Sequence, residues 1–271
     1  MKLVIDHLTR YGYDEEVKFS TQYLRLTPRS TGRQIITSWT LTLPEGAAVT
    51  TTDAWGNVLH VLTLDNPHKE IAIRASGIVD IAEDSEQSDV AEEELLSPLV
   101  YLRCTPLTRA DDRIREFAQR LYRHDEPEES LNQLMADLLL RMPYSPGATQ
   151  VQDCAADAFA RAKGVCQDHT HVFLACCRAL DIPARYVSGY VYSDNARHVA
   201  MHAWAEVWVN GRWQSFDITN NTRHLNQHLR LATGLDYLDA CPVRGTRLGG
   251  GGEIMLTNAE VRDHSQQAQQ Q

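Results

Sequence analysis

Cys166 is the residue that the sequence places best for nucleophilic chemistry. It lies in the segment Gly164-Val165-Cys166-Gln167-Asp168-His169, where a helix is predicted to begin. The first turn of a helix has unpaired N–H groups and the positive end of the dipole, so it favours a thiolate over a thiol. Cys176 and Cys177 fall in the apolar middle of the same helix and are typical of packed thiols. Cys166 is therefore the predicted nucleophile.

A hairpin further along the chain carries a candidate base. Residues 201–209, Met-His-Ala-Trp-Ala-Glu-Val-Trp-Val, form a predicted strand in which His202 and the other even positions share one face. The Asn210-Gly211 pair that follows is the strongest short signal for a two-residue turn. Such a turn sets Val209 opposite Arg212 and so defines the register of the two strands.

This register brings His202 close to a carboxylate. It places Trp204 opposite Asp217 and His202 opposite Thr219. His202 and Asp217 are then diagonal neighbours on one face, with Cβ atoms somewhat under ~7–8 Å apart, within reach of an imidazole–carboxylate hydrogen bond. A helix packed across the sheet could bring Cys166 to the same place.

Cysteine, histidine and aspartate together can attack a carbonyl group. The imidazole of His202 would take the thiol proton of Cys166, and Asp217 would fix the tautomer and stabilise the imidazolium. The backbone N–H of Cys166 would hold the developing oxyanion, with Gln152 and Tyr144 as candidates for a second donor.

The remaining pocket candidates are Gln167, Asp168, Tyr190 and Trp204. Aromatic residues of the predicted strands could line a substrate cleft, although strand aromatics belong to the core more often. These aromatic residues are Tyr186, Tyr190, Tyr192, Trp204 and Trp208.

The elements that position these residues are predicted from hydrophobic periodicity. Residues 1–82 contain short alternating segments separated by turns, which indicates a β-rich N-terminal domain. Residues 83–94 hold seven acidic and no basic residues, so 83–105 is the predicted acidic linker. Residues 106–264 are the predicted catalytic domain, and the polar tail 265–271 is expected to be disordered.

Inside the predicted catalytic domain, helices come first and strands second. Thr108-Arg109-Ala110-Asp111 has the form of a capping box before the first helix. A third helix is expected from about Cys154 to Lys163, with Gly164 as its C-terminal cap. The helix of Cys166, a strand at 184–192 and the hairpin follow, and this order predicts an α+β fold.

Composition excludes several classes of function. The formal net charge of -10 argues against a nucleic-acid binder, which needs a basic face. No run approaches the ~18 apolar residues of a membrane span, and the N-terminus lacks the apolar core of a signal peptide. Six cysteines in 271 residues are too sparse for a disulfide scaffold. We therefore expect a cytoplasmic protein, while the oligomeric state is not indicated.

Three segments of the chain resemble the signature blocks of bacterial transglutaminase-like proteins. They are Gly164–His169, His202–Val207 and Phe216–Asn221. The segments His7–Tyr13, Leu24–Arg29 and Asp53–Asn57 are similar to the β-rich N-terminal region that accompanies this core in bacteria, and Gly234–Tyr237 with Pro242–Gly245 to the end of the core.

The resemblance implies a papain-like core, in which a helix with the nucleophile packs on an antiparallel sheet. It assigns the nucleophile to Cys166, the base to His202 and the orienting acid to Asp217. Ile218 departs from the family pattern, where proline is expected, but it concerns a backbone turn and not a reacting group.

Two other assignments of the polar residues are open. Cys166, His169, His171, His198 and His202 could be metal ligands, but His169 and His171 are two apart on a helix and lack the i, i+4 spacing of a helical zinc site. His198 could replace His202 as the base, although no carboxylate is placed opposite it. We expect no metal and no cofactor.

The expected function is hydrolysis of amide bonds in a peptide or protein substrate. Water is the expected acceptor because the polar residues beside Cys166, Gln167 and Asp168, indicate a site that is open to water, and because no calcium-loop pattern is present. The alternatives are a protein-glutamine acyltransferase, that is a true transglutaminase, and a non-catalytic binding module on the same scaffold.

Overall fold

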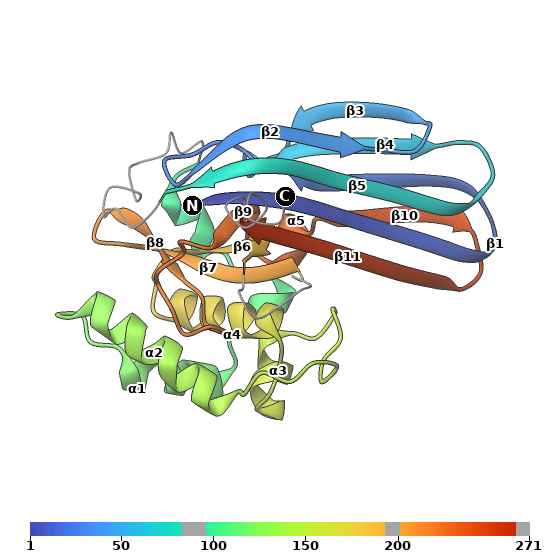
Figure 1. Ribbon diagram of the computed structural model, residues 1–271. Coiled ribbons are helices and arrows are strands. Elements are labelled where there is room, and N and C mark those ends of the chain that lie inside the picture. Colours follow the sequence, from blue (N-terminus) through green and yellow to red (C-terminus); the bar gives the residue numbers. More distant parts are fainter. Residues whose placement is uncertain (83–95, 193–200, 264–271) are drawn as a thin grey trace.

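The structure is a computed structural model that describes residues 1–82, 96–192 and 201–263. It has three layers: a large sheet, a smaller sheet beneath it and a layer of helices (Figure 1). The α+β fold predicted for the chain, with a β-rich N-terminal region, is confirmed. No helix of the described residues is long and apolar enough to cross a membrane.

The large sheet is built around one long strand, β1, which is 26 residues long (Lys2–Thr27). The strand order is β2-β5-β1-β4-β3, and β10 and β11 also pair with β1. The other strands are β2 (Gln34–Thr42), β3 (Ala47–Thr52), β4 (Val58–Leu64), β5 (His68–Ile81), β10 (Val243–Gly249) and β11 (Glu253–Asp263). Buried residues alternate along most of β1, as expected for a strand with one face on a core.

The two strands from the C-terminal end were not expected in this sheet. Residues 243–263 were assigned to the catalytic domain, whereas β10 and β11 extend the N-terminal sheet. The physical reason is the length of β1: β5 and β4 pair with its two halves on one side, and β11 and β10 with its two halves on the other. The predicted linker and the polar tail fall largely on residues 83–95 and 264–271, outside the described residues.

The small sheet is antiparallel and has the order β8-β7-β6-β9. Its strands are β6 (Ala184–Val191), β7 (Met201–Val209), β8 (Arg212–Phe216) and β9 (His228–Gly234). Apolar side chains of β6 and β9 pack against the large sheet, among them Tyr190, Leu229 and Leu231. This contact joins the two sheets through one core.

The helices cover the other face of the small sheet. They are α1 (Asp112–Leu121), α2 (Pro127–Arg141), α3 (Ala155–Arg161), α4 (Cys166–Ala179) and the short α5 (Tyr237–Ala240). Two 3-10 turns, η2 (Pro98–Leu102) and η3 (Pro106–Thr108), precede them. The core between α4 and the sheet contains Val172, Phe173 and Cys176 against Ala203 and Ala205.

Two predicted helix ends lie elsewhere. The capping box is formed by Thr105 and Thr108 around η3. The helix α1 begins at Asp112, after the N-cap Asp111, whose carboxylate accepts from the N–H of Ile114 (3.0 Å). The third helix ends at Arg161, and its C-terminal cap is Ala162, with the left-handed φ of 54°, two residues before the expected cap Gly164. Gly164 instead lies just before α4 and packs against Asp168 in its first turn.

Candidate active site

β7 and β8 form the predicted hairpin. Asn210 and Gly211 both have positive φ, 54° and 76°, as a tight two-residue turn requires. Val209 pairs with Arg212, and the predicted register continues over the whole of β8. This part of the geometry follows from local sequence alone.

The ladder ends one residue before Asp217. The expected pairs of Trp204 with Asp217 and of His202 with Thr219 therefore do not occur in the described strands. Asp217 exchanges backbone hydrogen bonds with Thr222 instead (2.9 and 3.0 Å), because the chain turns back after β8. His202 Nε2 nevertheless lies 2.8 Å from Asp217 Oδ2, so the predicted side-chain contact is present.

Cys166 is the first residue of α4, and Asp168 holds the helix start in place. The carboxylate of Asp168 accepts from the backbone N–H of Val165 (2.8 Å) and from the hydroxyl of Thr149 (2.6 Å). Gly164 permits this close packing, since a Cβ there would lie 2.6 Å from the Cβ of Asp168. Cys166 itself is a half-buried residue at the helix N-terminus.

His169 joins the helix of Cys166 to the loop that carries Asp217. Its Nε2 donates to the carbonyl oxygen of Met142 (2.7 Å), which leaves Nδ1 to accept from the hydroxyl of Thr219 (2.9 Å). The ring is fully buried. His169 therefore positions the two halves of the site and is not available as a metal ligand in this arrangement.

The electrostatics of the site favour a charged histidine. Burial lowers the pKa of His202, but the hydrogen bonds with Asp217 and Cys166 outweigh it and raise the pKa to about 10. Burial likewise raises the pKa of Asp217, whereas the donors His202 and His228 lower it to a net value well below its usual range. Because Nε2 of His202 is engaged by Asp217, Nδ1 is the nitrogen left for the thiol of Cys166.

Two residues of the site were not predicted. His228 Nε2 lies 2.8 Å from the same Asp217 Oδ2 that His202 contacts, and Asn220 Nδ2 donates to that oxygen at 2.6 Å. The backbone N–H of Asn220 donates to the other carboxylate oxygen (3.1 Å). Asn220 lies in a segment already singled out by resemblance, but His228 comes from β9, which no local pattern connects with the hairpin.

Gly189 explains how the two histidine rings approach each other. It lies in β6, between β7 and β9, where it pairs with His202 on one side. A Cβ at Gly189 would lie 2.1 Å from the carbonyl oxygen of Leu229 and 2.7 Å from the ring of Trp204. The missing side chain leaves room for Trp204, whose ring stacks on His202 and meets His228 edge-on.

The predicted pocket residues of the helical layer lie in different surroundings. Tyr144 forms an isolated bridge with Gly164 and is 53% exposed, so it stands beside the nucleophile at the surface. Burial, and then the charge of Cys166, raise its pKa. Gln167 instead donates to the carbonyl oxygen of Val151 (3.0 Å). Asp168 is buried as the helix cap described above, and Gln152 is exposed.

The two predicted pocket residues of the strands are buried. Tyr190 is fully buried, and its hydroxyl lies 2.7 Å from Nδ1 of His7 at the contact between the two sheets. Trp204 is 1% exposed and packs against His202. Tyr190 therefore belongs to the core between the two sheets, whereas Trp204 lines a small cavity of about 30 Å³ together with His228.

The described residues offer one group that could hold a metal ion. It consists of His202, Asp217 and His228, whose ligand atoms lie within 4.8 Å of one another. In this arrangement the two histidines donate to the carboxylate, so the cluster forms hydrogen bonds within itself. His171 accepts from the N–H of Tyr237 (3.1 Å), away from the cluster, and His198 lies outside the described residues.

An apolar cavity of about 530 Å³ lies against the large sheet, and none of Cys166, His202 and Asp217 lines it. Met201, which precedes His202 in β7, lines it together with Tyr237. The opposite wall belongs to the large sheet, from β1 and β11. A cavity of this size between the two sheets can hold a peptide side chain.

Two family models match the chain. Residues 115–218 match the transglutaminase-like superfamily, and residues 3–80 match the bacterial transglutaminase-like N-terminal region. The first match contains Cys166, His202 and Asp217, while the second covers strands β1 to β5 of the large sheet.

Relatives extend over nearly the whole chain. An uncharacterized protein of Mycobacterium leprae is 30% identical over 274 residues, covering 96% of this chain and 98% of its own. An uncharacterized protein of Mycobacterium tuberculosis is 28% identical, covering 94% and 88%. A solved structure from Cytophaga hutchinsonii, described as "a Putative Cysteine Protease", has a TM-score of 0.78 at 22% identity and covers 97% of this chain and 90% of that one. At that identity the likeness supports the fold.

Proposed function

Because this chain belongs to the transglutaminase-like superfamily and has the bacterial N-terminal region, we propose that it is a cysteine-dependent amide-bond hydrolase. Cys166 is the proposed nucleophile, His202 the proton carrier and Asp217 the group that orients His202. The observation that carries the proposal is the 2.8 Å contact between His202 Nε2 and Asp217 Oδ2, next to a helix that begins at Cys166.

In the first half of the proposed reaction, the sulfur of Cys166 attacks the amide carbon. The thiol proton has passed to Nδ1 of His202, in keeping with the raised pKa of that ring. The tetrahedral oxyanion is held by the backbone N–H of Cys166 at the helix start. The carbon–nitrogen bond then breaks, the leaving amine takes the proton from His202, and a thioester remains on Cys166.

In the second half, water replaces the amine. Nδ1 of His202 takes a proton from the water as its oxygen attacks the thioester carbon. The carbon–sulfur bond breaks, the carboxylic acid leaves, and the sulfur regains a proton from the imidazolium. Asp217 keeps the same hydrogen bond to Nε2 throughout, so it stabilises the charged ring in both halves.

Access from solvent supports water as the acceptor. Cys166 is half-buried, and Tyr144 beside it is 53% exposed. A site that selects an amine must exclude water and bind the amine separately. The apolar cavity that begins at Met201 is a suitable place for a side chain of the acyl donor.

The test is a partition experiment. The protein is incubated with short peptide amides and an excess of a fluorescent primary alkyl amine, and both free acid and labelled product are measured by mass spectrometry. We expect free acid to form first, and an acyl group of matching mass to be found on Cys166. Cys166→Ser should abolish both, whereas Cys104→Ser, at an exposed cysteine, should leave both unchanged.

Two results would overturn the proposal. Label entering product faster than acid appears would identify an acyltransferase. Tight peptide binding with neither product nor acyl group would identify a binding module.

A further inference from the structure

The small cavity of about 30 Å³ borders the candidate active site through His228. Its wall also includes Trp204 of β7 and Ser215 of β8. A water molecule needs a cavity of roughly 10–15 Å³, so there is room for one here.

Two of the side chains that line this cavity have a buried polar atom without a hydrogen-bond partner among the described residues. These atoms are Nε1 of Trp204 and Nδ1 of His228. Trp204 is 1% exposed and His228 is 7% exposed, so both rings lie beneath the surface. A buried polar group without a partner is destabilising, and an internal water is the usual remedy where a polar cavity adjoins it.

The two atoms are complementary as donor and acceptor. The indole Nε1–H of Trp204 can only donate. Nε2 of His228 donates to Oδ2 of Asp217 (2.8 Å), so Nδ1 of the neutral ring can only accept. The rings of Trp204 and His228 meet edge-on with centroids 5.2 Å apart. One water spans two partners about 5.5 Å apart through two hydrogen bonds of about 2.8 Å.

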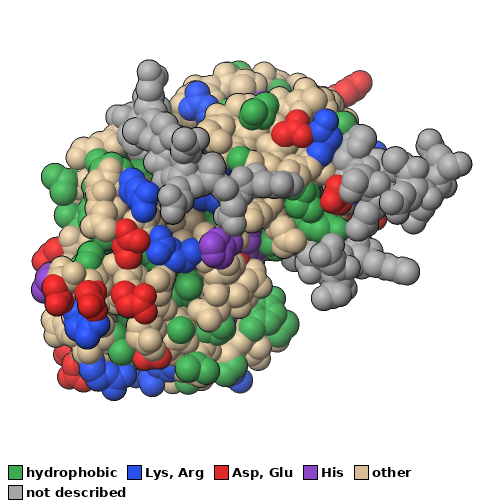
Figure 2. All heavy atoms as spheres, turned by 60° about the vertical axis from the view of Figure 1, so that its left-hand side comes forward, with side chains coloured by type: hydrophobic (Ala, Val, Ile, Leu, Met, Phe, Trp, Pro, Cys, Tyr) green, Lys and Arg blue, Asp and Glu red, His purple; other side chains and the backbone are tan. Residues whose placement is uncertain are grey.

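The surroundings of His228 favour its neutral form. Burial lowers the pKa of His228 and outweighs the opposite effect of Asp217, and the charges of His202 and Arg33 lower this pKa further. Figure 2 shows His side chains beside Lys or Arg side chains on one face of the molecule. A neighbouring positive charge disfavours protonation of an imidazole.

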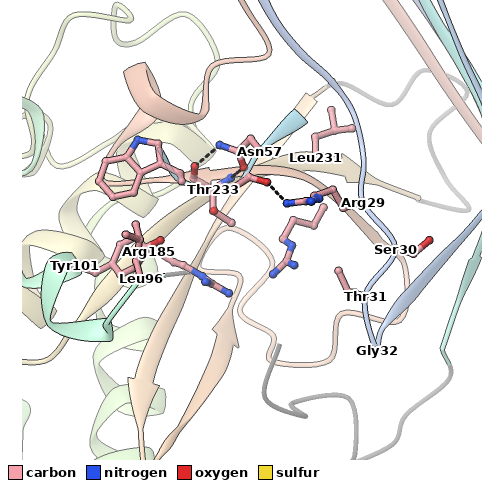
Figure 3. A pocket seen from close by; sticks show the side chains of 13 residues that line it. Arg29, Ser30, Thr31, Gly32, Asn57, Leu96, Tyr101, Arg185, Leu231 and Thr233 are labelled. Atoms are coloured by element: carbon pink, nitrogen blue, oxygen red, sulfur yellow. Dashed lines mark hydrogen bonds between the residues drawn. The ribbon is translucent and has the colours of Figure 1, made fainter. Parts of the chain in front are cut away.

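A larger cavity provides a route for water. This cavity, of about 500 Å³, shares Thr31 and Arg230 with the wall of the small one. Figure 3 shows Thr31 on a wall of the larger cavity, next to Gly32. Water that fills the larger cavity therefore needs to pass only their shared wall to reach the smaller one.

We propose that a water molecule binds in the small cavity, where it accepts from Nε1–H of Trp204 and donates to Nδ1 of His228. The hydroxyl of Ser215 on the same wall provides a third polar partner. The water holds the proton of His228 on Nε2, the nitrogen that bonds to Asp217. Trp204 is then a positioning residue that acts on Asp217 through the water and His228. This site goes beyond the proposed hydrolase activity and does not depend on it.

The first test is a crystal structure of the full chain at a resolution that shows ordered water. We expect a water within about 3.2 Å of both Nε1 of Trp204 and Nδ1 of His228. An empty cavity, or a molecule that does not contact both atoms, would overturn the proposal. This test needs no variant and no turnover.

The second test is nitrogen NMR of the chain labelled with ¹⁵N histidine, with the signals of His228 assigned by their loss in His228→Gln. An imidazole nitrogen that accepts a hydrogen bond resonates at lower frequency than a bare one. Trp204→Phe removes the indole N–H that anchors the water, so we expect Nδ1 of His228 to move to higher frequency. Circular dichroism checks that this variant folds. An unchanged Nδ1 resonance in the folded variant would mean that Trp204 does not hold the water, and the proposal would be wrong.

Trp213→Phe is the matched control. Nε1 of Trp213 is likewise buried without a partner among the described residues, but Trp213 does not line the small cavity. Its variant should leave the Nδ1 resonance of His228 where the parent chain has it. Equal displacements in Trp204→Phe and Trp213→Phe would reveal a general loosening of the small sheet and would also overturn the proposal.

Discussion

A single carboxylate oxygen organises the candidate site. Asp217 Oδ2 accepts from His202, His228 and Asn220, at 2.8, 2.8 and 2.6 Å. Since a carboxylate has no proton to donate when charged, both rings must present Nε2–H to it. The tautomer of His202 is therefore set by Asp217, and its Nδ1 is free to exchange a proton with Cys166.

The first prediction concerns that tautomer. Asp217→Asn should lower kcat by roughly 10²–10⁴-fold, because an amide can offer its N–H to Nε2 and so favour the wrong tautomer. Thermal unfolding should show that the variant still folds. Retention of more than about a third of the activity would contradict the role given to Asp217.

His228 is a positioning residue in this scheme, since it touches Asp217 and not the substrate. His228→Ala removes a charge-assisted hydrogen bond, and we expect kcat/KM to fall roughly 10-fold to 100-fold. Because His228 helps to lower the pKa of Asp217, its removal should also move the acid limb of the pH–rate profile to higher pH.

The control for His228 is His228→Gln, which keeps a donor of similar reach. It should recover part of the activity and most of the shift in the acid limb. A loss of activity in His228→Ala with an unchanged acid limb would mean that His228 only fills space.

The residues that sequence could place are those joined by local geometry. Cys166 follows from its helix start, and the contact of His202 with Asp217 follows from a turn of known register. His228 could not be placed this way, because β9 pairs with β6 and reaches Asp217 only through the order of the small sheet. The choice between pocket and core was left open for Tyr190 for the same reason, since the strand that covers its face is β1.

At the scale of elements, position 189 of β6 has no room for a side chain, because β6 lies between β7 and β9, the strands of His202 and His228. Gly189→Ala would put a Cβ 2.1 Å from the carbonyl oxygen of Leu229, a backbone atom that cannot swing away. We expect a loss of at least about 2 kcal/mol in the free energy of unfolding, the cost of overpacking a closed core. Chemical denaturation measures it.

Gly12→Ala is the matched control for Gly189→Ala. Gly12 also lies in a strand, β1, and a Cβ there would meet nothing within 4 Å. Its unfolding free energy should change by less than about 1 kcal/mol. If the two substitutions had equal effects, the close approach at Gly189 would carry no special cost.

At the scale of the whole molecule, the first strand of the chain pairs with the last one. β11 pairs with the first half of β1, so residues near 260 lie beside residues near 5. Alternation in sequence identifies such strands as strands, but not their partner more than two hundred positions away, since pairing at that distance depends on the complete fold. The predicted division into an N-terminal and a catalytic segment therefore missed the C-terminal share of the large sheet.

The contact between the two sheets contains a buried histidine, which makes the fold sensitive to acid. His7 is 3% exposed and contacts Tyr190, Thr9 and Thr257 at 2.7, 3.0 and 3.0 Å. Burial lowers its pKa to about 4, against a smaller opposite effect of Asp6. Between about pH 6.5 and pH 4 the unfolded chain thus binds a proton that the folded chain does not, so stability must fall as the pH falls through this range.

The last prediction follows from that difference. Between pH 7.0 and pH 5.0, His7 should contribute a loss of roughly 2 kcal/mol to the free energy of unfolding. His7→Gln keeps polar contacts without a titrating ring, so urea denaturation should show a smaller decrease for this variant than for the parent chain. His124→Gln, at an exposed position on the helical layer, should retain the parent's pH dependence. Parallel pH profiles for the parent and His7→Gln would mean that His7 takes up its proton without disturbing the packing of the two sheets, and that the acid sensitivity arises at another buried group such as His171.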